Sequence, residues 1–134
     1  MGITRKERGK EVIGAVQVLN ELQVDGNATV NGDASLNGAL SVKRASVNAD
    51  YTTSGDTIVG VDSSGGAVTV RLSSSDAQAG RVVIVKDEGG KAGTNNITIT
   101  TEGGETIDGG ASVTISSNYG VVRLYSDGSN WFTF

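Results

Sequence analysis

Residues 67–72 have the sequence Ala-Val-Thr-Val-Arg-Leu, and residues 81–86 have the sequence Arg-Val-Val-Ile-Val-Lys. In the first stretch Val68, Val70 and Leu72 alternate with polar residues, which is the period of a β-strand with one buried face. The second stretch holds an uninterrupted apolar run, which is typical of a central strand covered on both faces. Together the two stretches predict a fold built on β-sheets.

The composition supports this prediction. Val and Ile supply 25 residues against 6 Leu, and β-branched side chains fit a pleated sheet better than a helix. The chain also has 20 Gly and no Pro, which suits short strands joined by tight turns. We expect a small antiparallel β-sandwich or β-barrel head over residues 49–134. The strands expected in it are Thr57–Val61, Ala67–Leu72, Arg81–Lys86, Asn96–Thr101, Ser112–Ile115, Gly120–Ser126 and Trp131–Phe134.

Aromatic residues gather late in the predicted head. Large rings that lie close together dominate the energetics of cores and interfaces alike. We therefore expect the last hairpin to fill one end of the core or to form a subunit interface. The residues concerned are Tyr119, Tyr125, Trp131, Phe132 and Phe134.

A six-residue repeat precedes the head. Residues 24–41 contain Val-Asp-Gly-Asn-Ala-Thr, Val-Asn-Gly-Asp-Ala-Ser and Leu-Asn-Gly-Ala-Leu-Ser in succession. One aliphatic side chain per six residues cannot offset backbone ordering at roughly 1–2 kcal/mol per residue, so the segment needs identical neighbours. We expect a trimeric β stalk over residues 24–48. Its core would be formed by Val24, Val30, Leu36 and Val42.

A single-chain left-handed β-helix is the competing interpretation of the repeat, because it also places an aliphatic residue inward every six positions. Three repeats make only about one coil, whereas a stable solenoid needs roughly three or more stacked units. Chains that wind around one another are therefore favoured.

The first 23 residues carry a local excess of positive charge. Thr4 and Glu7 have the spacing of a capping box, but Gly9 and Gly14 would each cost about 1 kcal/mol inside a helix. We expect either a short helix or an extended arm over residues 1–23, and its charge suits an acidic partner, although a solvated terminus is the plain alternative. The expected anchoring residues are Arg5, Lys6, Arg8 and Lys10.

The residue inventory disfavours catalysis and cofactor binding. The chain has no His and no Cys, so the commonest metal ligands and the usual general base are missing. Its carboxylates lie mostly beside Gly or Ser in predicted turns, which leaves a two-carboxylate glycosidase as a minor alternative. We expect no enzymatic activity, no cofactor and no metal site.

Charge and hydropathy disfavour two further classes of partner. The net charge is −4, without the general basic excess that binding to a phosphate backbone requires. No apolar run approaches the roughly 20 residues of a membrane span, and the first residues lack the apolar stretch of a signal peptide. We expect neither nucleic acid nor membrane as a partner, and synthesis in the cytoplasm.

Several stretches of the predicted head resemble a known module. Residues 105–109, 118–120 and 124–132 are similar to the end of a β-domain common in tailed-phage fibre, spike and capsid-decoration proteins, and residues 83–88 and 95–99 are similar to its upstream part. The resemblance covers roughly residues 50–134. It implies a trimeric, outward-facing component of the virion with no catalytic residues to carry over.

The plan of the chain favours a location on the head of a bacteriophage. A short basic arm, three stalk repeats and one head suit a homotrimeric capsid decoration (cement) protein or head fibre, which would bind the major capsid protein on the outer capsid surface. Such a protein would be made in the host cytoplasm before lysis. The alternative is the tip of a tail fibre that recognises a host surface glycan.

Overall fold

The computed structural model describes residues 20–134 of the chain. The basic residues of the predicted arm, Arg5, Lys6, Arg8 and Lys10, lie outside the described residues, as does most of the predicted helix or arm at residues 1–23. The chain divides into two compact units, Met1–Ala39 and Leu40–Phe134. Each is described below by itself.

The repeat segment forms no regular secondary structure within a single chain. Residues 20–43 contain bends but no helix and no strand. The aliphatic residues that begin the three repeats are largely exposed, at 51% for Val24, 62% for Val30 and 65% for Leu36. Val42, which closes the repeat, is 42% exposed. The trimeric stalk stays a prediction, and within residues 20–134 the side chains assigned to its core remain 42–65% exposed.

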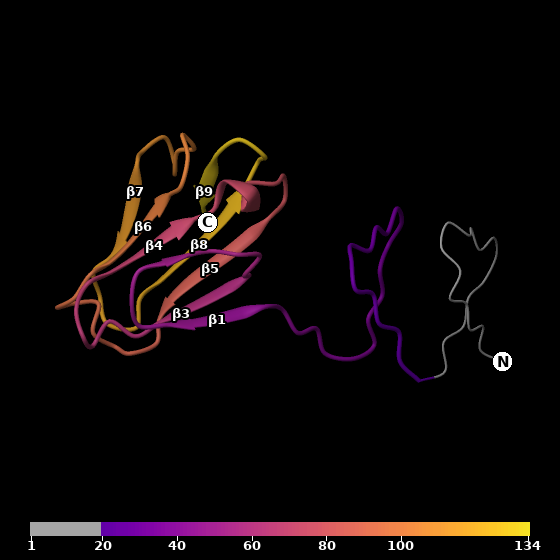
Figure 1. Ribbon diagram of the computed structural model, residues 1–134, viewed down its shortest axis with the longest axis horizontal. Coiled ribbons are helices and arrows are strands. Elements are labelled where there is room, and N and C mark those ends of the chain that lie inside the picture. The colour runs from indigo at the N-terminus through magenta and orange to yellow at the C-terminus, as the bar shows by residue number, and fades with distance from the viewer. Residues whose placement is uncertain (1–19) are drawn as a thin grey trace. The chain divides into compact units, whose positions relative to one another are not determined.

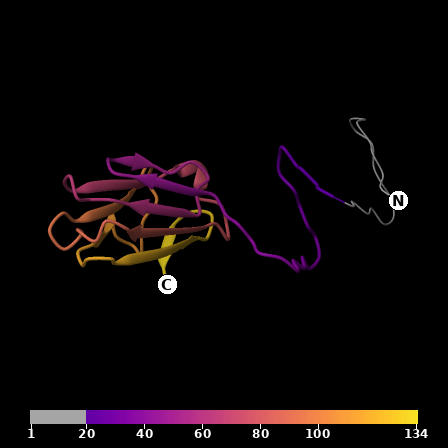
Figure 2. The same cartoon turned by 90° about the horizontal axis from the view of Figure 1, so that it is seen from below.

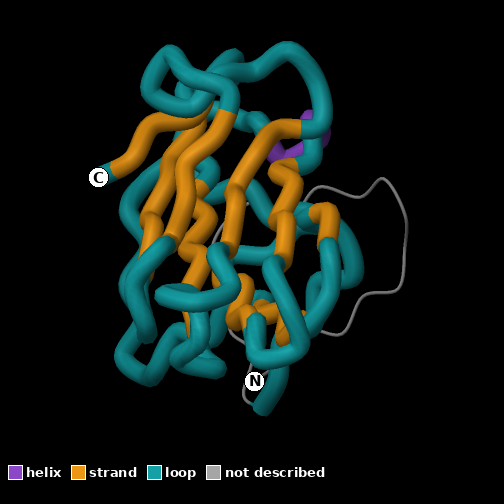
Figure 3. Tube along the Cα trace, turned by 90° about the vertical axis from the view of Figure 1, so that its left-hand side faces the viewer, coloured by secondary structure: helices purple, strands orange, loops and turns teal. Residues whose placement is uncertain are grey.

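The second unit holds nine strands in two sheets, joined by loops and one short 3₁₀ turn, η1, at Ser74–Asp76 (Figures 1 and 3). The five-stranded sheet has the order β1 (Arg44–Val47), β3 (Ile58–Val61), β5 (Val82–Asp87), β8 (Val121–Ser126) and β9 (Trp131–Thr133). The four-stranded sheet has the order β2 (Tyr51–Thr52), β4 (Val68–Leu72), β6 (Ile97–Thr101) and β7 (Ser112–Ile115). In Figure 2, magenta strands lie at one side of this unit and yellow strands at the other, as the edge positions of β1 and β9 require.

The mainly β fold is confirmed, and each of the seven predicted strands is present with its ends shifted by at most one residue. The sequence did not indicate β1 and β2, which are short and weakly patterned. Since β1 pairs with β3, residues 44–47 belong to the sheet although they fall within the predicted stalk.

The expectation of an antiparallel head is wrong, because both sheets are mixed. Strands β1 to β6 alternate between the two sheets, so each strand pairs in parallel with the strand two places along the chain. Only β5–β8, β6–β7 and β8–β9 pair antiparallel. A tight turn reverses the chain whether the next strand joins the same sheet or the opposite one, so turn chemistry could not distinguish the two arrangements. Parallel neighbours in one sheet need a crossover connection between them. Here the strand that lies between them in sequence belongs to the opposite sheet and forms part of that connection.

The inward faces of both sheets contribute to one hydrophobic core. The five-stranded sheet supplies Val83, Val85 and Trp131 to it, and the four-stranded sheet supplies Val70 and Ile99, all with no exposed surface. Full burial of a side chain of this kind stabilises a fold by about 1.5–3 kcal/mol. Alternation along each strand therefore decides which residues hold the sheets together.

The sequence predicts that both sides of the run Val82–Val85 are buried, but only one side is fully buried. Strand β5 does lie at the centre of its sheet, but Val82 and Ile84 are half-buried while Val83 and Val85 are fully buried. The prediction that β5 is covered on both faces is therefore wrong for the single chain. The outward side of β5 carries Val82, Ile84 and Lys86, which are only partly covered.

Candidate functional site

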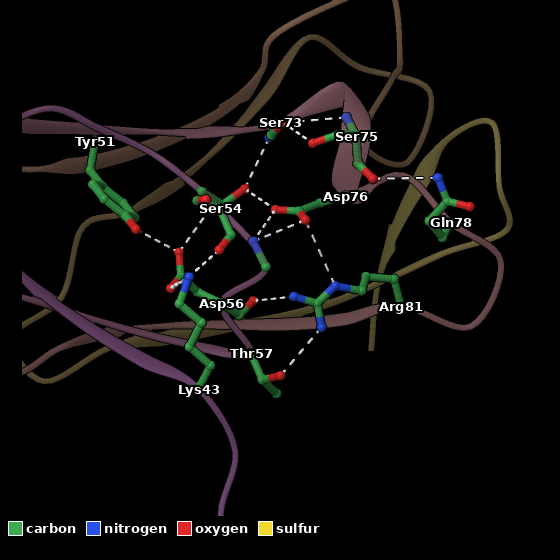
Figure 4. Close-up of polar contacts among 12 residues, drawn as sticks. Lys43, Tyr51, Ser54, Asp56, Thr57, Ser73, Ser75, Asp76, Gln78 and Arg81 are labelled. Carbon is green, nitrogen blue, oxygen red and sulfur yellow. Dashed lines mark hydrogen bonds and ion pairs between the residues drawn. The ribbon is translucent and has the colours of Figure 1, made fainter. Parts of the chain in front are cut away.

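Two buried carboxylates form the most conspicuous polar cluster of the second unit (Figure 4). Asp56, in the loop between β2 and β3, accepts hydrogen bonds from the Tyr51 hydroxyl at 2.6 Å and the Ser54 backbone N–H at 2.9 Å. The Lys43 ammonium lies 3.4 Å from its other oxygen. Burial alone would raise the pKa of Asp56, but these three partners outweigh burial and lower that pKa, while the bond to Asp56 raises the pKa of Tyr51 to about 12.

The second carboxylate, Asp76, sits at the end of η1. It accepts hydrogen bonds from the Thr53 hydroxyl at 2.7 Å and the Gly55 backbone N–H at 3.1 Å, and Arg81 Nε lies 4.0 Å away. Both carboxylates are nearly inaccessible, with Asp56 1% and Asp76 6% exposed. Because every polar contact ties them to their own chain, the cluster fixes the loop after β2 against η1 and the start of β5. We assign it a structural role.

A third carboxylate, Asp87, organises the loops at the other end of β5. It is fully buried and accepts hydrogen bonds from the backbone N–H groups of Gly90 and Ala92 at 3.0 Å and of Tyr119 at 2.9 Å. Burial would raise the pKa of Asp87, but these donors outweigh it and hold the pKa below its ordinary value. The contact also holds Tyr119 in a left-handed backbone conformation, at φ 59°.

The structure separates the five aromatic residues that the sequence grouped together. Trp131 is fully buried in the core, whereas Tyr119 lies in the turn before β8 and is 63% exposed. Tyr125, Phe132 and Phe134 lie together on the outer face of the five-stranded sheet. Of the two roles expected for these residues, the core position applies to Trp131, and the interface role stays a prediction for the three outer residues.

The three outer aromatic residues form one cluster. The rings of Tyr125 and Phe132 are stacked with centroids 5.5 Å apart, and the ring of Phe134 meets Tyr125 edge-on at 5.9 Å. Arg123, also on the outer face of β8, places its guanidinium over the Phe134 ring at 5.6 Å and donates a hydrogen bond to the Phe134 carbonyl at 3.0 Å. We call these four residues the aromatic cluster.

Apolar side chains extend the aromatic cluster across the sheet. Residues paired across a ladder lie on the same face, so the register continues the face from Tyr125 to Val82 and from Arg123 to Ile84 and then to Ile58. At the end of β8, Val121 is 47% exposed. A hollow of about 280 Å³ adjoins the cluster and is lined by Val113, Val121, Val122, Arg123, Thr133 and Phe134. We call the outward side of the five-stranded sheet the apolar face.

The outward side of the four-stranded sheet has a different chemistry. The register places one row of three threonines, Thr69, Thr98 and Thr114, across β4, β6 and β7. The neighbouring row is polar as well and consists of Thr52, Arg71, Thr100 and Ser112. We call this side the hydroxyl face.

A signal for the apolar face is present in the sequence, but the same signal is typical of a strand covered by its own chain. Val82 and Ile84 are apolar at positions that β-strand alternation turns outward. Of the residues assigned to the stalk core, Val24, Val30 and Leu36 belong to the first unit, whereas Val42 belongs to the second unit and is 42% exposed.

Comparisons with known proteins give no family to which the chain can be assigned, since no family model matches it and no curated protein matches it significantly. Within residues 20–134, no three potential metal-ligating side chains come together, and no helix is long and apolar enough to cross a membrane. The apolar face, with its exposed Val121, Tyr125 and Phe134, is the candidate functional site on structural grounds.

Proposed function

We propose that this protein is a non-enzymatic structural component of a bacteriophage virion, a homotrimeric capsid decoration protein or head fibre. In this proposal the first residues bind the outer capsid surface, the repeats form a trimeric stalk, and the two sheets are the layers of a β-sandwich head that projects outward.

The observation that carries the proposal is the exposure of the repeat. Val24, Val30 and Leu36 are each more than half exposed in one chain, at regular six-residue intervals. Removing each such side chain from water stabilises a structure by about 1.5–3 kcal/mol. A neighbouring chain with the same repeat in the same register would bury all three of them. Closed symmetric assembly of identical chains meets this requirement.

A second support is the resemblance of residues 50–134 to a β-domain of phage fibres and decoration proteins, which implies a trimer. A third is the chemistry of the buried carboxylates. Asp56 and Asp76 are buried and accept hydrogen bonds from Tyr51 and Thr53, which supports a structural role for these two carboxylates.

The charge of the chain supports the proposed location on a capsid. Four basic residues crowd the first ten positions of a protein with net charge −4. Arms of this kind, three to a trimer, would pair with acidic side chains of the major capsid protein, and the effective concentration within a trimer multiplies individually weak contacts.

Cosedimentation tests this location directly. We expect the purified full chain to bind saturably to mature phage capsids that lack tails, and a variant without residues 1–10 to stay trimeric but lose binding. Unchanged binding by the truncated trimer would refute the anchor. Binding to host cells but not to capsids would refute the capsid location and favour the tail-fibre alternative, in which the head recognises a surface glycan.

A further inference from the structure

The apolar face lies on a side of the sheet that measures a few hundred Å². Strands lie about 4.8 Å apart and rise about 3.3 Å per residue, so five strands of three to six residues present roughly 300–500 Å² in projection. Arg44, Lys86 and Arg123 take part of this area and apolar residues take the rest, and exposed apolar patches of a few hundred Å² are often functional. The half-buried Ile58, Val82 and Ile84 lie at its middle, and the exposed Val121 and Tyr125 lie toward one edge.

The geometry of the aromatic cluster disfavours a sugar as the occupant. A sugar ring stacks on a free aromatic face. Here one face each of Tyr125 and Phe132 is used in their mutual stacking, and one face of Phe134 is used by Arg123. These contacts reduce the open ring surface for a sugar, while rings and aliphatic side chains of this kind are common at protein interfaces.

Three cations lie on this face and only one has an anionic partner. Arg44 pairs with Glu88, whereas the Lys86 ammonium donates to the Tyr119 carbonyl and Arg123 donates to the Phe134 carbonyl, both neutral acceptors. A protein that covers the face must therefore leave Lys86 and Arg123 at the solvated rim of the contact or offer them acidic groups.

The size of the face and the position of β1 identify the occupant as a second copy of the chain. A standard interface buries about 800 Å² on each partner, so the apolar face alone would hold free heads together only weakly. A shared stalk changes this, because it raises the effective concentration of neighbouring heads to about the millimolar range. The last residue of the repeat, Val42, precedes β1 by a single residue, and β1 is an edge of the sheet that bears the apolar face.

We propose that the apolar face is covered by a second copy of the chain, with three heads turning their five-stranded sheets toward a common axis and their hydroxyl faces toward solvent. This inference rests on the proposed trimer and adds to it the surface by which the heads meet. The stalk supplies proximity, and the apolar face supplies the contact.

Cysteine accessibility tests the proposal in the full chain, which has no cysteine of its own. Single substitutions Tyr125→Cys and Val121→Cys place a thiol on the apolar face, and Thr114→Cys places one on the hydroxyl face as the matched control. Val121→Cys changes little volume, so it reports on the face even if loss of the Tyr125 ring weakens packing. The measurement is the rate of labelling by a maleimide-linked polymer, with the native mass determined on the same sample.

We expect three-chain assemblies in which the thiols of the Val121→Cys and Tyr125→Cys variants are labelled at least tenfold more slowly than the thiol of the Thr114→Cys variant. In denaturant the three variants should be labelled at equal rates. Three-chain assemblies with equal native rates would overturn the covered face and leave the stalk trimer standing. A single-chain mass would overturn both proposals.

Discussion

The two sheets of the head are alike on their inner sides and unlike on their outer sides. Val83 and Val85 from one sheet and Val70 and Ile99 from the other are all fully buried in one core. Outward, the four-stranded sheet presents threonine and serine hydroxyls, while the five-stranded sheet presents Ile, Val, Tyr and Phe together with Arg44, Lys86 and Arg123. A core explains the first pattern but not the second. In the proposed trimer, the four-stranded sheet meets solvent and the five-stranded sheet meets the neighbouring heads.

The repeat segment also exposes apolar side chains. Within residues 20–134 its aliphatic residues recur at largely exposed positions, as Val121, Tyr125 and Phe134 do on the outer side of the five-stranded sheet. The repeat and the five-stranded sheet are close in sequence, because only one residue lies between Val42 and the start of β1. One assembly of several chains would cover the apolar residues of both.

The largest effect is expected for the inner sides, where the two sheets should behave alike. Leu72 on β4 and Leu124 on β8 are both fully buried, so Leu72→Ala and Leu124→Ala should each lower the free energy of unfolding by about 2–5 kcal/mol. Urea unfolding of each variant measures this. A loss below about 1 kcal/mol for one of the two would show that its sheet does not share the core equally.

The next effect concerns Asp87, the buried carboxylate at the end of β5. Asp87→Asn exchanges one acceptor oxygen for a donor that faces backbone N–H groups, and it should cost about 1–3 kcal/mol near neutral pH. The pKa of Asp87 is lowered in the folded chain, so its stabilising contribution is present above its ordinary value of 3.8 and is lost as the pH falls through the lower folded pKa.

Unfolding free energies measured from about pH 7 to about pH 3 check this sign. The gap between the original chain and Asp87→Asn should narrow below about pH 4. Asp33→Asn, at an exposed position in the repeat, is the control and should leave the unfolding free energy unchanged. A gap that widens toward low pH would contradict the assignment of Asp87 as an ionised acceptor.

A smaller effect separates the outer faces in assembly rather than in folding. Tyr125→Ala removes one ring from the aromatic cluster and should weaken association of the chains about tenfold, with little change in unfolding of the single head. Dilution series followed by light scattering measure the association. Thr114→Ala, on the hydroxyl face, should leave it unchanged, and equal weakening by both variants would erase the distinction between the faces.

The smallest effect is expected at the middle of the hydroxyl face. Thr98 is half-buried on β6, and Thr98→Val keeps its shape and its β-branched character. We expect a change within about 0.5 kcal/mol in unfolding and no change in native mass. A strong gain in association would show that the hydroxyl face also borders a partner.

Most strands could be predicted from the sequence because alternation is a local property. Val68, Val70 and Leu72 specify one buried face whatever their neighbours are, and the observed β4 agrees with that pattern. The parallel pairing could not be predicted in this way, since it depends on which sheet the next strand joins. Strands β1 and β2 escape prediction because they are short and are held by their partners more than by their own pattern.

The candidate site was only partly predictable, for a related reason. The late aromatic residues are close together in the sequence, but successive residues of a strand point to opposite faces. Trp131 therefore faces the core, and its neighbour Phe132 faces outward. The apolar run of β5 is visible in the sequence, yet a run covered by its own chain and a run covered by another chain have the same letters. The structure distinguishes the two cases, because it shows that Val82 and Ile84 point outward and are only partly buried within their own chain.

If the chain buries its exposed apolar residues by forming a trimer, native mass spectrometry of the full chain at micromolar concentration will show it. We expect one dominant species of about three times the chain mass of 13.6 kDa. A dominant single-chain species would contradict it, because the repeat residues and the apolar face would then both remain exposed to water.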